Sequence, residues 1–96
     1  MSLDITQDTE HSRFSTVVDG HRCVIDYLLK DGVMTITHTG VPDAVGGRGI
    51  AAELTQFALE SVRKAGLKVV PVCSYTAAYV RRHPEFADIL KKINNT

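Results

Sequence analysis

The sequence predicts a compact α+β domain: an antiparallel meander, then a β-α-β unit with a splayed pair of parallel strands, then C-terminal helices. Short runs of alternating, β-branched residues are separated by turn residues, a long amphipathic segment follows them, and an apolar run comes directly after that segment. A strand on each side of a helix predicts a right-handed crossover with parallel pairing. The 96 residues are enough for one domain. We place this domain at 13–96, after a polar and flexible N-terminus at 1–12.

The meander is predicted from three runs of residues at 14–18, 21–29 and 33–39. An Asp-Gly pair follows the first run and is a strong signal for a tight hairpin, and a Lys-Asp-Gly turn follows the second. β-Branched residues dominate the third run. Alternation along this run places three side chains on one face of the strand: Met34, Ile36 and His38.

A helix is predicted at 50–65, where apolar side chains repeat at helical spacing. Gly66 follows this segment and supplies the expected stop, because glycine readily adopts the left-handed conformation that ends many helices. The stripe that this spacing places on the inner face consists of Ile50, Leu54, Phe57, Ala58, Ser61, Val62 and Ala65.

The apolar run at 68–72 predicts a buried strand that contains Pro71. Because proline has no N–H group, this strand lies at an edge or is interrupted there, and an interruption would open a slot between the parallel strands. A short helix is predicted at 74–82, since His83 precedes Pro84 and resists helical geometry. Pro84 can start a last helix. Its apolar stripe would consist of Phe86, Ile89, Leu90 and Ile93.

The composition narrows the range of functions. Eleven basic and eleven acidic residues give a formal net charge of zero, without the basic excess of nucleic-acid-binding proteins, so we predict no nucleic-acid partner. No run approaches the ~20 apolar residues of a membrane span, so we predict no membrane partner. Cys23 and Cys73 show neither zinc-ligand spacing nor a disulfide framework, which predicts no metal site and a reducing, cytoplasmic location. The sequence leaves the oligomeric state open.

A glycine-rich loop lies between the third run and the predicted helix, with glycines at Gly46, Gly47 and Gly49. Glycine lacks the Cβ atom that would keep a ligand away from the backbone. The N–H groups from Gly46 through Ala51 are therefore predicted to point outward at the positive end of the helix dipole. This arrangement is typical of a phosphate or diphosphate site. The alternative interpretation is a connection whose glycines only satisfy turn geometry.

Four motifs in chain order resemble the GNAT superfamily of N-acetyltransferases. The acetyl-CoA motif of this superfamily, Gln/Arg-x-x-Gly-x-Gly/Ala, is matched at Gly49 and Ala51, whereas Gly46 stands where Gln or Arg is usual. More narrowly, the chain resembles the small, single-domain GNAT-like subgroup over nearly its whole length. The motifs that carry this resemblance are His38-Thr39-x-Val41-Pro42, Gly47-Arg48-Gly49-Ile50-Ala51, Pro71-x-Cys73-x-Tyr75, and Tyr79 followed by His83-Pro84-Glu85.

The resemblance implies an acetyl-CoA-dependent N-acetyltransferase that transfers an acetyl group to an unidentified amine by direct attack in a ternary complex. The backbone of the glycine-rich loop would hold the diphosphate of coenzyme A. Arg48 would add a charged contact, or else lie in solvent as a first-turn side chain. The pantetheine arm would lie in the slot beside Thr39 to Val41. The cofactor-binding residues implied in this way are Val41, Gly46, Gly47, Arg48, Gly49, Ile50 and Ala51.

Three residues are candidates for the chemistry. Tyr79 is the candidate general acid for the coenzyme A thiolate, because tyrosine is protonated at neutral pH; the alternative is a core tyrosine that covers the sheet. Cys73 comes between a strand and a helix, where the pKa of a thiol can be lowered, so it would lie near the thioester or act as a nucleophile; otherwise it is a small buried side chain. His38 suits a general base, or is a structural histidine bonded to the backbone.

Two other functions are compatible with parts of the sequence. A non-catalytic module that binds coenzyme A or an acyl-CoA and acts through a protein partner is one alternative, because position 46 lacks the usual Gln or Arg. Nucleotide binding by a P-loop is the weaker alternative, since no Gly-Lys-Ser/Thr follows the glycines.

Overall fold

A computed structural model describes residues 3–91 and shows a five-stranded mixed sheet with the strand order β1-β2-β3-β4-β5. The first three pairings are antiparallel, and β5 pairs with β4 in parallel after the helical crossover. The predicted α+β fold with a meander and a β-α-β unit is therefore confirmed. The strands are β1 (Thr6–Asp8), β2 (Arg13–Val18), β3 (His21–Lys30), β4 (Val33–Gly40) and β5 (Lys68–Pro71).

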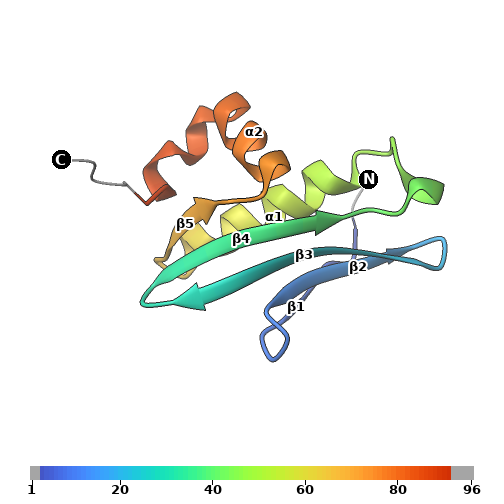
Figure 1. The fold of residues 1–96 in the computed structure, drawn as a ribbon, viewed down its shortest axis with the longest axis horizontal. Helices are drawn as coiled ribbons and strands as arrows, with labels where there is room; N and C mark the ends of the chain where they lie inside the picture. Colours follow the sequence, from blue (N-terminus) through green and yellow to red (C-terminus); the bar gives the residue numbers. More distant parts are fainter. Residues whose placement is uncertain (1–2, 92–96) are drawn as a thin grey trace.

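Helix α1 (Ile50–Lys64) passes behind β4 and β5 in Figure 1, and α2 (Ser74–Arg82) lies beyond the β5 edge of the sheet. Two 3₁₀ segments complete the fold, η1 (Asp43–Val45) before α1 and η2 (Pro84–Ile89) after α2. Both helices and η2 contribute to one core with the inner face of the sheet. The core therefore joins the meander to the β-α-β unit, and it fixes the position of α2 relative to α1.

The turn residues act as predicted. Asp19 and Gly20 both have positive φ, 49° and 78°, as a two-residue hairpin turn requires. Gly66 has φ 72° directly after the C-cap of α1 and ends the helix. Pro71 is the last residue of β5, and β5 is an edge strand, so proline sits where its missing N–H costs least.

Both ends of the chain differ from the prediction. Residues 1–12 are predicted to be flexible, but Thr6–Asp8 forms β1, which pairs with β2. The polar composition of β1 hides it, because an exposed edge strand buries too little to show alternation. The predicted last helix is a 3₁₀ segment that stops at Ile89, and Leu90 instead forms a bridge to Val69 of β5. Ile93 lies outside the described residues.

Helix α1 buries a slightly different stripe from the predicted one. Phe57 is 40% exposed and packs edge-on against Phe14, with ring centroids 5.9 Å apart, while Leu59 is completely buried. Each of the six buried residues has another three or four positions away along the helix, and Thr55 and Leu59 widen the stripe on the side away from Phe57. The buried residues of α1 are Ile50, Leu54, Thr55, Ala58, Leu59 and Val62.

A β-bulge in β4 overturns the predicted placement of His38. Tyr27 pairs with Ile36, but the preceding residue, Asp26, pairs with His38, so β4 carries one extra residue. The extra residue shifts the alternation, and His38 therefore lies on the outer face of the sheet, opposite Met34 and Ile36. In agreement, a Cβ atom on Gly40 would come within 3.1 Å of His38 Nε2, which places residues two apart on one face.

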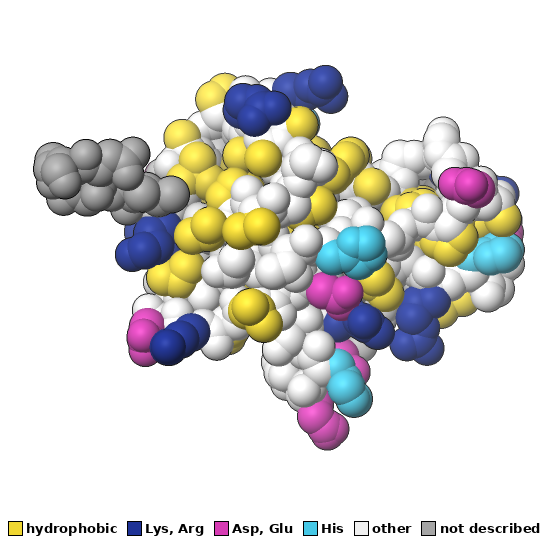
Figure 2. Space-filling view, in the orientation of Figure 1, with side chains coloured by type: hydrophobic (Ala, Val, Ile, Leu, Met, Phe, Trp, Pro, Cys, Tyr) yellow, Lys and Arg dark blue, Asp and Glu magenta, His cyan; other side chains and the backbone are white. Residues whose placement is uncertain are grey.

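The outer face of the sheet is divided by composition. In the orientation of Figure 1, hydrophobic side chains gather over the half with β5 and α2, and histidine side chains lie on the other half (Figure 2). Basic side chains lie on both halves, including the top of the view over α2. Leu28 and Val72 are among the exposed hydrophobic residues, at 64% and 62%. Between residues 3 and 91, no helix is long and apolar enough to cross a membrane.

Candidate functional site

The parallel strands β4 and β5 separate beyond Ile36. Their pairing ends at Ile36 and Pro71, and the N–H groups of Val72 and Cys73 both donate to the Ile36 carbonyl oxygen, at 3.0 and 2.9 Å. The chain then turns into α2, while β4 continues to Gly40 without a partner on this side. The parallel pair is therefore interrupted as predicted, because β5 ends early, and the slot is the free edge of β4 beside Cys73. An extended ligand can pair with this free edge of β4.

The glycine-rich loop presents free backbone donors at the end of the same slot. The N–H groups from Gly47 through Ala52 have no acceptor among the described residues, because the first bond of α1 joins Glu53 N–H to the Gly49 carbonyl. The sequence predicts that these donors begin at Gly46, but the Gly46 N–H donates to Asp43 O at 3.1 Å and is not available. The row of free donors therefore starts and ends one residue later than predicted.

Two glycines give this loop its shape and its open surface. Gly47 and Gly49 have φ values of 77° and 79°, in the left-handed region that side chains disfavour. A Cβ atom on either glycine would meet nothing within 4 Å, so both face open space beside the free N–H groups. A ligand can therefore approach the backbone there without displacing a protein atom.

The other predicted loop residues have structural side chains. Ile50 is 2% exposed and belongs to the core, so it can serve a ligand only through its N–H group. Val41 packs against the core, and Ala51 is half-buried. Arg48 Nη1 lies 2.6 Å from Asp19 Oδ2, in the β2–β3 turn, and both side chains are largely exposed. An exposed ion pair of this kind contributes about 0–1 kcal/mol, so Arg48 can exchange this partner for another anion.

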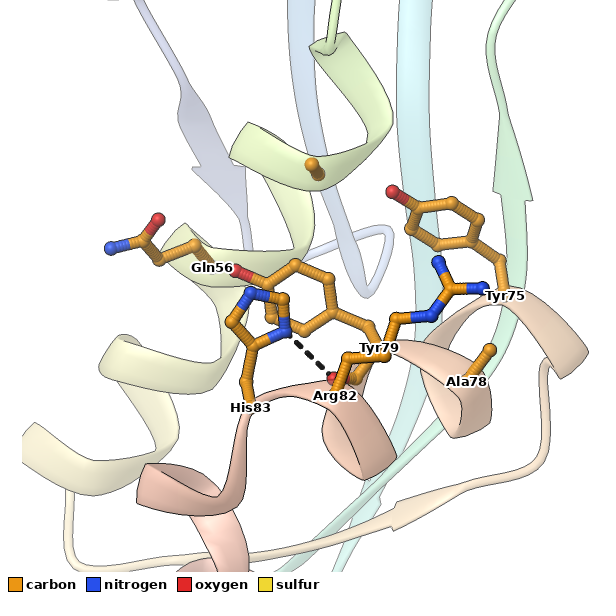
Figure 3. A pocket seen from close by; sticks show the side chains of 7 residues that line it. Gln56, Tyr75, Ala78, Tyr79, Arg82 and His83 are labelled. Carbon is orange, nitrogen blue, oxygen red and sulfur yellow. Dashed lines mark hydrogen bonds between the residues drawn. The ribbon is translucent and has the colours of Figure 1, made fainter.

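A cavity of about 540 Å³ lies between α1 and α2. Helix α1 contributes Ala52, from the turn with the free donors, and Gln56, and five residues come from α2 and its C-cap: Tyr75, Ala78, Tyr79, Arg82 and His83. Figure 3 shows the Tyr79 hydroxyl directed at Gln56 and the Arg82 guanidinium reaching toward Tyr75. The cavity thus joins the free donors of α1 to a wall of aromatic and cationic side chains.

Tyr79 is the most enclosed of the polar groups in this cavity, at 8% exposed. Its ring stacks on His83, with centroids 3.9 Å apart and planes 14° apart. Burial raises the pKa of Tyr79, and the negative charge of Glu85 adds to this effect. The hydroxyl therefore keeps its proton at neutral pH, as a proton donor must.

Cys73 lies in the slot at the N-cap of α2. Its Sγ is 3.5 Å from the Thr39 hydroxyl oxygen on the free part of β4. Burial works to raise the pKa of Cys73, but hydrogen bonds from the Thr39 hydroxyl and from the first turn of α2 outweigh it, and the pKa is lowered. The N–H groups of Thr76 and Tyr75 contribute to this effect. The Thr76 hydroxyl is fully buried and has no hydrogen-bond partner at ordinary distance within the described part of the chain.

The structure brings only some of the predicted residues together. Cys73 lies beside the free edge of β4, the loop donors follow β4 in the chain, and Tyr79 lies in the cavity between α1 and α2. His38 is on the opposite face of the sheet and does not join them. Between residues 3 and 91, no group of three or more His, Cys, Asp or Glu side chains is placed to hold a metal ion.

Sequence reasoning missed Gln56, Arg82 and His83 as lining residues. The sequence pattern predicts that Gln56 lies on the outer face of α1. The cavity exists only because α2 packs beside that face. The spacing of Tyr75, Tyr79 and Arg82, at four and three residues, was the available signal, because such residues share one side of a helix.

Comparison with known proteins agrees with this geometry. The chain is similar to protein NATD1 of Mus musculus, at 35% identity over 85% of this chain and 77% of the relative, and to protein NATD1 of Xenopus tropicalis, at 36% over 86% and 79%. The solution structure of a GCN5-like candidate N-acetyltransferase from Staphylococcus aureus superposes with a TM-score of 0.73 and 26% identity, covering 99% of this chain and 95% of that one. Residues 13–89 match the GCN5-related N-acetyl-transferase family, and the chain belongs to this family.

Proposed function

We propose that this protein binds acetyl-CoA and transfers its acetyl group to an amine. The observation that carries this proposal is the presence of three features in one domain: the free N–H groups of Gly47 through Ala52, the free edge of β4, and the cavity between α1 and α2, which Ala52 also lines. Members of the GCN5-related family generally use acetyl-CoA, and the residues present here suit that molecule.

The loop suits the diphosphate of coenzyme A in charge and in space. Consecutive N–H groups at a helix N-terminus favour an anion through their partial positive charge. Gly47 and Gly49 leave open space in front of these donors, where side chains would otherwise stand. Arg48 would leave Asp19 to add a full positive charge. The cofactor supplies an activated acetyl thioester when it is bound.

The slot suits the pantetheine arm, whose amide groups need backbone partners. Beyond the bulge, residues 38–40 of β4 have β3 on one side and no strand on the side where β5 has ended, so the backbone groups that point to that side can pair with a ligand. Thr39 and Cys73 close the inner end of the slot, so the thioester would lie against them. Cys73 would contact the thioester there.

Tyr79 would donate the proton that the leaving thiolate needs, and the proton that the attacking amine loses would return to the Tyr79 phenolate through solvent. Its hydroxyl lies in the cavity, and its raised pKa keeps it protonated. A positioned general acid contributes about 10²–10⁴-fold to a rate. His38 is not part of this mechanism, because the bulge directs it away from the slot.

A non-catalytic acyl-CoA-binding module is the second candidate, and the placement of His38 favours it. The residue predicted as the base for the amine lies outside the slot, whereas the features that would hold the cofactor are intact.

Calorimetry with acetyl-CoA, followed by an acetyl-transfer assay on small amines, polyamines and lysine peptides, tests both functions. Saturable binding with turnover supports the enzyme. Saturable binding without turnover on any acceptor supports the binding module, and the absence of binding contradicts both.

A further inference from the structure

His83 lines the cavity beside Tyr79 and has no role in the transfer described so far. It follows α2, and Pro84 holds its backbone outside helical geometry, at φ −126° and ψ 76°. Its ring lies flat on Tyr79 at a centroid separation of 3.9 Å, which is closer than the 6.5 Å that separates Tyr75 from Tyr79 and the 6.3 Å that separates Phe86 from it. One face of Tyr79 is thus covered by a side chain that can carry a charge.

The hydrogen bond of His83 fixes which ring nitrogen faces the cavity. Nδ1 lies 2.8 Å from the carbonyl oxygen of Tyr79, one helical turn earlier. A carbonyl oxygen only accepts, so Nδ1 must carry a proton and donate it. Nε2 is then the nitrogen that gains or loses a proton, and Figure 3 shows it turned toward the hydroxyl end of Tyr79. Protonation therefore adds charge without breaking the bond that holds the ring.

We propose that His83 is a positioning residue of the site: it fixes the plane of the Tyr79 ring, and protonation at Nε2 promotes proton donation by the Tyr79 hydroxyl. The physical cause is a positive charge placed against an aromatic ring, which favours the phenolate form and so lowers the pKa of Tyr79. The catalytic part of this inference rests on the proposed acetyl transfer, and the coupling between the two rings does not.

Four other charged or titratable groups lie near Tyr79. Glu60 is on α1, Tyr75 and Arg82 are on α2 together with Tyr79 and line the same cavity, and Glu85 is on η2. None of these is a histidine, and His11, His21 and His38 do not line the cavity. A replacement at His83 therefore isolates its contribution.

Tyrosine ¹³Cζ NMR of the ligand-free protein from about pH 5 to about pH 8 tests the coupling, because histidine ordinarily titrates in this range. The Tyr79 signal, assigned by its loss in Tyr79→Phe, should show one titration step. His83→Phe keeps a stacked ring without a titrating nitrogen and should abolish the step, and His21→Phe, the control, should retain it. His83→Asn, which keeps a donor for the Tyr79 carbonyl, should also abolish the step and provides a second test if His83→Phe does not fold.

The pH dependence of turnover tests the catalytic part. The ratio of kcat for the wild type to kcat for His83→Phe should rise as the pH falls from about 8 to about 5.5. No step at Tyr79 in the wild type, or a step that persists in His83→Phe, would overturn the coupling. A ratio that does not change with pH would overturn the role of His83 in proton donation. If coenzyme A does not bind at all, the proposed function fails, and the NMR titration still decides the coupling.

Discussion

At the scale of single residues, the two cysteines occupy opposite environments. Cys23 is completely buried in the core, and burial raises the pKa of its thiol. The pKa of Cys73 is lowered instead, because the hydrogen bonds of its slot outweigh the effect of burial. The reactive thiolate form is therefore more populated at Cys73. The Thr39 hydroxyl on β4 and the N–H groups of the first turn of α2 make this difference, and no sequence pattern places β4 and α2 together.

Alkylation should consequently select Cys73. We expect iodoacetamide to modify Cys73 at neutral pH well before Cys23 in the native protein. Thr39→Val should slow this modification, because it removes the hydroxyl that contacts Sγ and so raises the pKa of Cys73. Peptide mass spectrometry over time measures both rates. Thr55→Val is the control, since the Thr55 hydroxyl bonds to Ala51 O at 2.7 Å. Faster alkylation of Cys23, or no effect of Thr39→Val, would contradict this account.

Tyr79→Phe should lower kcat by about 10²-fold or more while leaving the Kd of acetyl-CoA nearly unchanged. Phenylalanine keeps the packing against His83 and removes only the proton that the thiolate requires. Because the pKa of Tyr79 is raised, the hydroxyl stays protonated beyond the ordinary tyrosine pKa, and turnover should not fall through loss of this proton between neutral pH and about pH 10. Tyr75→Phe, on the same wall of the cavity, is the control and should change kcat much less. Equal turnover in the wild type and Tyr79→Phe would remove Tyr79 from the chemistry.

At the scale of elements, the glycine-rich loop owes its form to positive φ angles at Gly47 and Gly49. We expect Gly47→Ala and Gly49→Ala each to cost about 1 kcal/mol of stability, from the strain of a left-handed alanine. They should also weaken acetyl-CoA binding, because the new methyl group stands where the diphosphate would lie. Gly66→Ala is the matched control: Gly66 has φ 72° and equally open surroundings at the far end of α1. It should cost similar stability and leave affinity intact. If Gly66→Ala loses as much affinity as Gly47→Ala and Gly49→Ala, backbone strain alone explains the loss, and contact with the diphosphate does not.

The ion pair between Arg48 and Asp19 gives a second test of the loop. Arg48→Ala should weaken acetyl-CoA binding, because a cation beside the diphosphate is lost. Asp19→Asn should strengthen it or leave it unchanged, because asparagine tolerates the φ of 49° at this position and frees Arg48 for the ligand. Calorimetry at two salt concentrations measures both effects, since screening weakens exposed charge interactions. Weaker binding in Asp19→Asn would mean that Arg48 serves the fold and not the ligand.

Local signals predicted most elements, and their failures have physical causes. The β2–β3 turn, α1 and the end of α2 follow from short-range chemistry: an Asp-Gly pair, helical spacing and a proline. β1 and the bulge at Thr37 could not be predicted, because each depends on a partner strand. The bulge mattered most for the site. One extra residue in β4 places His38 on the other face of the sheet, and the alternation of residues in the sequence does not indicate this bulge.

At the scale of the whole molecule, the fold was predictable because every level of the sequence agrees on it. Turn residues, periodicity and the helical crossover all specify the same arrangement of β2 to β5, with helices packed on the inner face of the sheet. The slot could also be predicted, since Pro71 marks the end of β5. The cavity could not, because its walls come from the packing of α2 against α1, which no local pattern encodes.

Ligand binding should stabilise the whole domain, because the free donors and the cavity exist only in the folded state. At a concentration of acetyl-CoA one hundred times its Kd, linkage adds about 2.7 kcal/mol of stability. For a domain of this size the Tm should rise on the order of 10 °C or more. ATP and GTP at the same concentration should raise the Tm far less, because they lack the pantetheine arm that fits the slot. Differential scanning calorimetry measures these shifts in Tm. A larger rise in Tm with ATP or GTP than with acetyl-CoA would contradict the choice of cofactor.

The most direct test of the account is a ¹⁵N–¹H NMR titration with acetyl-CoA, because it observes the backbone donors themselves. We predict that the amide signals of residues 47–52 shift saturably and together, with the signals of residues 38–40 following at the same Kd. The Gly46 amide, already bonded to Asp43, should shift less than its neighbours. A saturable response located elsewhere on the molecule, or no response to acetyl-CoA at all, would contradict the central claim that these amides hold the cofactor.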